Sequence, residues 1–420
     1  MTQAGPASMS LTIMRGTDTL VRKAWGLADI ESRRSATPDL TYRIGSTSKQ
    51  FTASLILKLV DRGRLSLGDS IGRYLNGLRP EWRGITIGQL LNHTGGLQSE
   101  YRQASRRLES LPADSLIAMA RRDSMAFIPG TSWGYSNTGY MLLGALVEKL
   151  YDRPYGQVLH AEIARPLGLT TLGWCNDQAQ LAIAARGYDR PAQEALRPAV
   201  EVNPDLALGA GGICASSGDL TTWNRALHGG RVLAPATYAA MTTPDGPASL
   251  SEYGFGLRIH RTPWGSRVIE HGGATPGFIA ENAWYPAESL SVTLLYNTSP
   301  PPANGGISGM LARIALGLPP AASQSVSDSG TMEATQFTKL TGTYELAPGL
   351  GVVISVENGG LVAEQRGRPK RPVIPQPGMT FVVGGNGPPV TIRFDIGSDG
   401  RATAMIFLQN GNERRAPRLP

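Results

Sequence analysis

Residues 46–61, STSKQFTASLILKLVD, begin with a serine and a lysine three positions apart and continue as an apolar helical pattern. On that helix, at about 100° per residue, Lys49 lies on the apolar stripe with Ala53, Ile56 and Val60. A charged amine there is costly unless it is paired or neutral, and burial lowers the pKa of a lysine. The segment therefore predicts an amine that can accept a proton, one helical turn from the Ser46 hydroxyl, at a helix start that favours negative charge.

The Ser-x-x-Lys spacing alone does not establish a catalytic pair. A chain with 31 serines and six lysines shows this spacing by chance about 0.4 times. The alternative is a serine that caps the helix, followed by a lysine whose amine extends to the surface. The other polar clusters of the chain decide between the two interpretations.

The composition indicates a globular chain of more than one domain, since 420 residues with 41% hydrophobic side chains can bury a large core. No apolar run reaches membrane-spanning length. The start, MTQAGPASMS, shows no signal peptide, which fits a cytoplasmic enzyme or the mature or trimmed form of a periplasmic one. Two cysteines, Cys175 and Cys214, permit at most one disulfide and match no metal spacing, so free buried thiols are expected.

The net charge of +7 does not indicate a nucleic-acid partner. Of the 40 cationic residues 34 are arginines scattered along the chain, and the one dense cluster, at 366–371, has no interleaved aromatic residues. Binding to nucleic acid is therefore not expected. The sequence does not indicate an oligomeric state.

Strand patterns lie at both ends of residues 1–317, and helical patterns lie between them. The expected strands are 9–14, 20–27, 253–260, 267–272, 279–286 and 290–297. The expected helices are 51–61, 86–92, 113–121, 138–150, 155–165, 218–228 and 306–316. This order predicts an α/β domain, with an antiparallel sheet flanked by helices and an inserted all-helical subdomain.

The rest of the chain has a different character. Residues 318–335, LPPAASQSVSDSGTMEAT, read as a linker. Residues 336–420 predict a small all-β barrel. Its expected strands are 341–346, 351–357, 360–365, 379–384, 390–396 and 402–408.

Two further polar clusters stand at the ends of predicted elements. Tyr135-Ser136-Asn137 precedes the helix 138–150, where a phenol could relay a proton and an amide could hold a substrate carbonyl; the alternative is a set of capping residues. His271-Gly272-Gly273-Ala274 ends the strand 267–272, and its glycines allow a substrate or another backbone to approach the strand edge. By itself, His271 fits a structural role as well as a functional one.

In this order, the three clusters resemble the signature motifs of the serine β-lactamase and penicillin-binding-protein superfamily. The resemblance covers residues 9 to about 317. Additional segments are similar to the class C β-lactamase-like branch: 92–97 (NHTGGL), 129–130 (PG), 211–216 (GGICAS) and 253–256 (YGFG).

The resemblance implies a two-step acyl transfer without cofactor or metal. It implies Ser46 as nucleophile, Lys49 as its base, Tyr135 as proton relay and Asn137 as the amide that contacts the substrate. The backbone N–H groups of Ser46 and Ala274 would form the oxyanion hole. His271, with the substrate-contacting Gly272 and Gly273, would complete the site.

His271 and Gly272 stand where many relatives carry Lys and Thr. A neutral imidazole and a glycine supply neither the charge nor the hydroxyl that grips a carboxylate, which argues against a lactam or carboxypeptidase substrate. His-Gly-Gly, with residues 24–26 (AWG) and 48–52 (SKQFT), resembles the D-aminopeptidase and esterase branches. There a lipocalin-like barrel lies near the active site; this chain has one such domain, where D-aminopeptidase has two.

The resemblance therefore implies a D-amino-acid-specific peptidase or amidase that acts on small molecules or short peptides. A carboxylesterase with the same machinery, or a non-catalytic relative that binds penicillin or peptidoglycan, are the alternatives. Gly130-Thr131-Ser132-Trp133-Gly134 also matches the nucleophile elbow of α/β-hydrolases. That motif needs a strand before the serine and a helix directly after it, so Ser132 is not expected to be the nucleophile.

Overall fold

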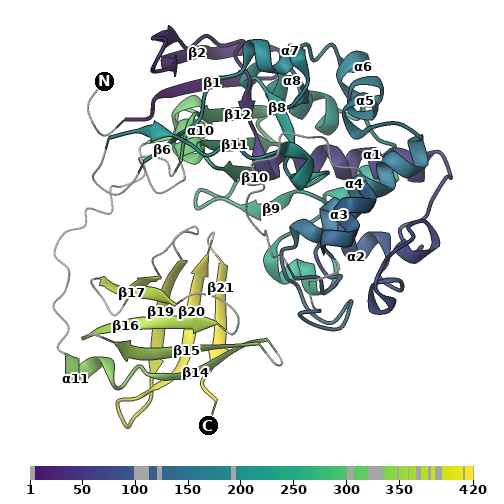
Figure 1. Ribbon diagram of the computed structural model, residues 1–420. Helices are drawn as coiled ribbons and strands as arrows, with labels where there is room; N and C mark the ends of the chain where they lie inside the picture. Colours follow the sequence, from purple (N-terminus) through teal and green to yellow (C-terminus); the bar gives the residue numbers. More distant parts are fainter. Residues whose placement is uncertain are drawn as a thin grey trace. The chain divides into compact units, whose positions relative to one another are not determined.

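The computed structural model describes residues 5–98, 113–120, 125–190, 195–299, 307–319, 334–347, 350–357, 359–365, 370–376, 380–383, 390–409 and 412–419 (Figure 1). It contains two compact units. One comprises Met1–His260 with Arg267–Leu318, and the other Arg261–Ser266 with Pro319–Pro420. No helix in the described ranges is long and apolar enough to cross a membrane.

A seven-stranded sheet, counted over the described residues, forms the centre of the first unit in the order β3-β2-β1-β12-β11-β10-β9. Its strands are β1 (Ser8–Arg15), β2 (Asp18–Asp29), β3 (Arg34–Ser35), β9 (Arg258–Arg261), β10 (Arg267–Thr275), β11 (Phe278–Tyr285) and β12 (Leu290–Tyr296). β1 pairs antiparallel with β12, from Met9 opposite Tyr296 to Arg15 opposite Leu290. The two ends of the unit's sequence thus meet in one antiparallel sheet, which confirms the predicted fold class.

Helices cover both faces of this sheet. Successive residues of a strand point to opposite faces. On β11, Asn282 accepts a hydrogen bond from Asn224 of α8 (Ser217–His228) at 2.9 Å, whereas Glu281 accepts one from the Ser308 backbone of α10 (Ile307–Ala315) at 3.0 Å. α8 and α10 therefore lie on opposite faces, and the strand β12 between them is buried along its length.

The helical part of the unit follows β4 (Tyr42–Arg43) and precedes β8 (Ile213–Ala215). Its helices are α1 (Lys49–Asp61), α2 (Ile87–Leu91), α3 (Ala113–Ala120), α4 (Asn137–Tyr151), α5 (Tyr155–Leu159), a π-helical turn (His160–Ala164), α6 (Arg165–Leu167) and α7 (Gln178–Ile183). α9 (Pro235–Met241) follows α8. α1 packs against α4 in the core, and even its Gln50 is fully buried, where it accepts a hydrogen bond from Trp223 Nε1 at 2.7 Å.

The segment predicted as a strand at 253–260 is a strand only from Arg258 on. Its glycines explain the difference. A Cβ on Gly254 would lie 2.2 Å from the Met241 carbonyl oxygen, and one on Gly256, at φ +70°, 2.7 Å from the Lys49 carbonyl oxygen. The backbone here packs against other backbone instead of pairing in the sheet. β10, by contrast, runs to Thr275, three residues beyond the predicted end.

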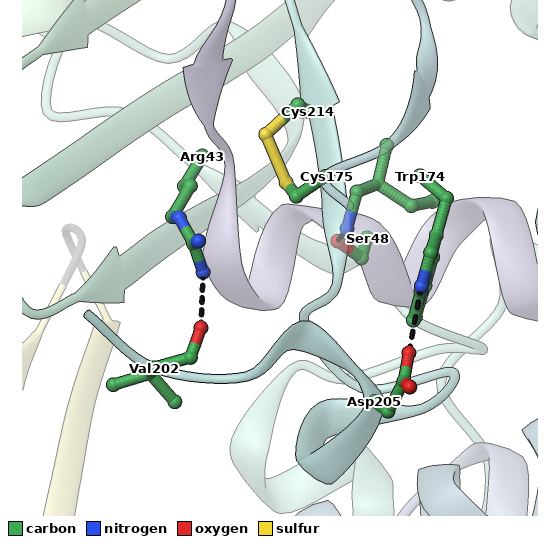
Figure 2. The surroundings of a disulfide bond; sticks show 8 residues. Arg43, Ser48, Trp174, Cys175, Val202, Asp205 and Cys214 are labelled. Atoms are coloured by element: carbon green, nitrogen blue, oxygen red, sulfur yellow. Dashed lines mark hydrogen bonds between the residues drawn. A yellow bond between two sulfur atoms is a disulfide. The ribbon is translucent and has the colours of Figure 1, made fainter. Parts of the chain in front are cut away.

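The prediction of free thiols was wrong, because Cys175 and Cys214 form a disulfide (Figure 2). β5 (Gly173–Trp174) pairs with β8, with Gly173 opposite Cys214, and this register brings the two Cα atoms to 5.0 Å. The cysteines are 39 positions apart, and the pairing of these short strands has no signal in the sequence.

The second unit contains an eight-stranded sheet in the described residues, in which each strand pairs with the next. Its elements are α11 (Ala334–Phe337), β14 (Gly342–Ala347), β15 (Leu350–Glu357), β16 (Gly360–Gln365), β17 (Arg371–Gln376), β18 (Thr380–Val383), β19 (Val390–Ile396), β20 (Ala402–Gln409) and β21 (Asn412–Pro417). A bridge between Tyr344 and Arg418 joins the first strand to the chain after the last. This nearly closed barrel, filled by apolar side chains such as Phe381 and Phe394, confirms the predicted all-β fold.

Two strands of the barrel were not predicted. β17 (RPVIPQ) contains two prolines and β21 (NERRAP) is mostly polar, so neither shows the alternation of apolar residues that indicates a strand. The barrel pairs them through their backbones. Most of the predicted linker, residues 320–333, lies outside the described residues, as do residues 366–369 of the arginine cluster.

Candidate active site

Ser46 lies in a 3-10 turn, Gly45–Ser48, that leads directly into α1. This turn packs backbone to backbone against β10. A Cβ on Gly45, where φ is +50°, would lie 2.8 Å from the Ala274 nitrogen, and one on Gly273 would lie 1.9 Å from the Ile44 carbonyl oxygen. Only glycine fits at such distances. The close approach brings the predicted oxyanion residues, Ser46 and Ala274, into one neighbourhood.

β10 offers an edge at this point. β9 has four residues and β10 has nine, and the turn at Thr262–Ser266 joins them, so β10 continues past β9 from about His271 on. Thr47 Oγ1 donates a hydrogen bond to the His271 carbonyl oxygen at 3.1 Å, which fixes the turn on that edge. An extended substrate could pair with the remaining exposed backbone groups.

Lys49 is fully buried at the start of α1. Its Nζ lies 3.2 Å from Ser46 Oγ, 2.8 Å from Asn137 Oδ1 and 2.9 Å from the Ala210 carbonyl oxygen. Burial lowers the pKa of Lys49 well below its usual value. The amide and carbonyl oxygens can only accept, whereas the Ser46 hydroxyl can also donate. A neutral Lys49 therefore donates to Asn137 and Ala210 and directs its lone pair to Ser46.

Tyr135-Ser136-Asn137 combines both roles considered for it. Ser136 is the N-cap of α4, and its Oγ accepts a hydrogen bond from the Gly139 N–H at 3.1 Å. Tyr135 and Asn137 belong to the site instead: the Tyr135 ring lies 4.8 Å from Lys49 Nζ, which Asn137 also contacts. The cap orients the segment so that its two neighbours face the lysine.

His271 is buried beside this group. Its Nε2 lies 2.9 Å from Tyr253 Oη, its Nδ1 2.6 Å from the Gly272 carbonyl oxygen, and its ring 6.3 Å from the Tyr135 ring. Burial lowers the pKa of His271 to about 3. The imidazole is thus neutral near pH 7 and supplies no cation for a substrate carboxylate.

The two glycines of the His-Gly-Gly motif differ in their surroundings. Gly273 is buried against the serine turn, where no side chain fits. Gly272 is exposed, and a Cβ on it would meet its nearest atom, the Ala280 carbonyl oxygen, at 3.5 Å. Gly273 therefore sets the approach of β10 to Ser46, and Gly272 faces outward.

Ser132 does not lie in a nucleophile elbow. In the described part of the chain around it, no strand precedes it, and α4 begins five residues later at Asn137. The described residues contain no group of three or more His, Cys, Asp and Glu side chains able to hold a metal ion.

Three groups of the site had no predicted role. The Ala210 carbonyl accepts from Lys49, the Tyr253 hydroxyl contacts His271, and the His93 ring lies 4.4 Å from the Tyr135 ring. His93 and Tyr253 belong to the family-like segments 92–97 and 253–256, which were the only signal for them. A backbone carbonyl such as that of Ala210 leaves no signal in a sequence.

This chain is similar to several known proteins. The D-aminopeptidase of Brucella anthropi is 29% identical over 398 residues, covering 91% of this chain and 70% of that enzyme. The D-aminopeptidase of Brucella ovis is matched over 66% of its length. A D-stereospecific amidohydrolase from Streptomyces is 28% identical, with a TM-score of 0.62 over 71% of this chain and 92% of that one.

The likeness of fold extends to the whole chain. The octameric penicillin-binding protein homologue from Pyrococcus abyssi, 24% identical, superposes with a TM-score of 0.68 over 98% of this chain and 96% of its own. The family model described as Beta-lactamase matches residues 1–317. The predicted resemblance is confirmed: this chain is a serine hydrolase that belongs to the beta-lactamase family.

Proposed function

We propose that this enzyme hydrolyses amide bonds of small D-amino-acid-containing substrates through an acyl-enzyme on Ser46. The observation that carries the proposal is the position of Lys49, whose buried Nζ lies 3.2 Å from Ser46 Oγ and has two other neighbours that only accept hydrogen bonds. A neutral amine held in this way is suited to take the serine proton.

In the proposed reaction, Ser46 Oγ bonds to the substrate carbonyl carbon while its proton passes to Lys49 Nζ. The N–H groups of Ser46 and Ala274 stabilise the oxyanion. As the C–N bond breaks, the Tyr135 hydroxyl gives a proton to the leaving amine and regains one from Lys49. Water then loses a proton to Lys49 and attacks the acyl group. The bond between the acyl carbon and Ser46 Oγ breaks, the acid is released, and Lys49 returns the proton to Ser46 Oγ.

Two observations support a D-amino acid amide as substrate. The relatives named above are D-aminopeptidases and a D-stereospecific amidohydrolase. His271 is buried and neutral, so it does not attract a substrate carboxylate as a lysine would. The role proposed for His271, together with Tyr253, is to shape the pocket beside Tyr135 without adding charge, while Gly272 leaves room for the substrate.

The buried Cys175–Cys214 bond supports maturation in an oxidising compartment such as the periplasm, because disulfides rarely persist in a reducing cytosol.

The test compares D- and L-amino-acid p-nitroanilides with short p-nitrophenyl esters. We expect the D-anilides to be preferred by kcat/KM, and Ser46→Ala to lower the rate at least about 10³-fold while the matched variant Ser132→Ala stays near wild type. Intact mass spectrometry with a serine-directed phosphonate should label Ser46. Loss of turnover in folded Ser132→Ala but not in Ser46→Ala would exclude this mechanism. Turnover of the esters alone would indicate a carboxylesterase. Absence of both turnover and phosphonate labelling would indicate a non-catalytic relative.

A further inference from the structure

His93 holds the chain on both sides of Tyr135. Its carbonyl oxygen accepts a hydrogen bond from the Gly134 N–H at 3.0 Å, and its ring Nδ1 accepts one from the Ser136 N–H at 3.2 Å. Between these two anchors, the Tyr135 ring lies 4.4 Å from the imidazole. We infer that His93 is a positioning residue that fixes the Tyr135 hydroxyl for proton transfer. The inference rests on the proposed function, in which Tyr135 relays the proton.

The backbone of His93 indicates that its side chain is needed. α2 ends at Leu91 with Asn92 as its C-cap, and His93 follows in the left-handed region with φ +64°. Glycine is the usual residue at that position after a helix, and a residue with a side chain is less common there. The strain of this conformation is compensated by what the ring does for the segment that carries Tyr135.

The ring must also be neutral and in one tautomer. Nδ1 accepts from Ser136, so the proton is on Nε2, which is buried and has no hydrogen-bond partner in the described part of the protein. The rings of Tyr253 and Tyr140 lie 4.7 and 5.1 Å from the imidazole. Leaving a buried donor unpaired is unfavourable, so a residue that only filled space would be expected to be apolar. The acceptor at Nδ1 is the feature that an apolar residue lacks.

Small errors in the position of a catalytic group are costly, since a displacement of about 1 Å can lower a rate by about 10²-fold. Removal of the Nδ1 acceptor frees Ser136 and, with it, the Tyr135 ring that lies over Lys49 Nζ at 4.8 Å. The expected effect is a lower kcat with KM little changed, because the substrate pocket keeps its shape.

The experiment uses the full chain and a short alkyl ester, whose leaving alkoxide needs a proton as an amine does, so it does not depend on the D-amide preference. His93→Gly keeps the left-handed backbone but lacks the acceptor, and His93→Asn keeps the backbone and offers Oδ1 near the place of Nδ1. We expect kcat to fall about 10–100-fold in His93→Gly, with KM within threefold, and to recover at least in part in His93→Asn. Thermal unfolding confirms that both variants are folded.

A double-mutant cycle with Tyr135→Phe decides between positioning and a general structural effect. If His93 acts through Tyr135, adding His93→Gly to Tyr135→Phe lowers kcat no more than about threefold further. Multiplicative losses, or a His93→Gly enzyme as active as wild type, would overturn the inference. Tyr135→Phe by itself tests the proton relay of the proposed function, so failure of that function is seen separately.

Discussion

The Cys175–Cys214 bond gives a prediction whose size follows from the chain. It joins residues 39 positions apart, and both sulfur-bearing residues are 3% exposed. In the chain-entropy relation, a closed loop of that length removes about 13 cal/mol/K from the unfolded state, or about 4 kcal/mol at 25 °C. Replacing both cysteines by alanine is therefore expected to lower the free energy of unfolding by about 2–4 kcal/mol.

The loop also bears on the active site. Ala210, whose carbonyl holds Lys49 at 2.9 Å, lies within the closed segment, four residues before Cys214. Cys214 sits on β8, where the Ile213 N–H donates to Ser48 Oγ at 3.3 Å. The double variant should lose some kcat as well as stability, because the carbonyl that orients Lys49 is less firmly held.

The assay is urea unfolding followed by tryptophan fluorescence. Six of the seven tryptophans lie in the first unit, and Trp264 lies in the second, so the signal reports mainly on the unit that contains the disulfide. Single replacement of Cys175 or Cys214 by alanine is the control, since either breaks the bond and should cost as much as both. Native enzyme treated with a thiol reductant should keep its activity until urea unfolds it, because the bond is buried. A loss under about 0.5 kcal/mol, or two free thiols in the native protein, would refute the reasoning.

Three further predictions concern the site and the core. Gly273→Ala should lower kcat about 10²–10³-fold, because its Cβ would lie 1.9 Å from the Ile44 carbonyl oxygen and displace the oxyanion groups. The control Gly272→Ala should keep a kcat at least about ten times that of Gly273→Ala. Equal losses of kcat in the two variants, measured by steady-state kinetics, would contradict this prediction. The rate should fall as pH is lowered, since only neutral Lys49 accepts the Ser46 proton and burial lowers the pKa of Lys49; a pH–rate profile without an acidic limb would argue against Lys49 as base. Burial lowers the pKa of His228 to about 3, so the unfolded chain binds this proton first and stability is lost as pH falls from about 6.5 toward 3. His228→Gln should reduce that slope by up to about 1.4 kcal/mol per pH unit in urea unfolding, and an unchanged slope would be the contrary result.

The sequence alone predicted that Ser46 and Lys49 lie near each other, because residues three positions apart in a helical segment lie on one face. The same local regularity located most helices and strands of the first unit, whose apolar periodicities are strong. The order of the three polar clusters then indicated the protein family and the class of reaction. These inferences need only short stretches of chain, or motifs that stay in order.

The tertiary structure decided what depends on distant contacts. Lys49 meets Asn137 and Ala210 across 88 and 161 positions, and no periodicity reports such a pairing. The disulfide depended on the register of two short strands, and the different roles of Gly272 and Gly273 on how closely β10 approaches the serine turn. The contact between His93 Nδ1 and the Ser136 N–H forms only in the folded chain. Backbone groups make many of these contacts, and because every residue carries the same backbone, a sequence does not record them.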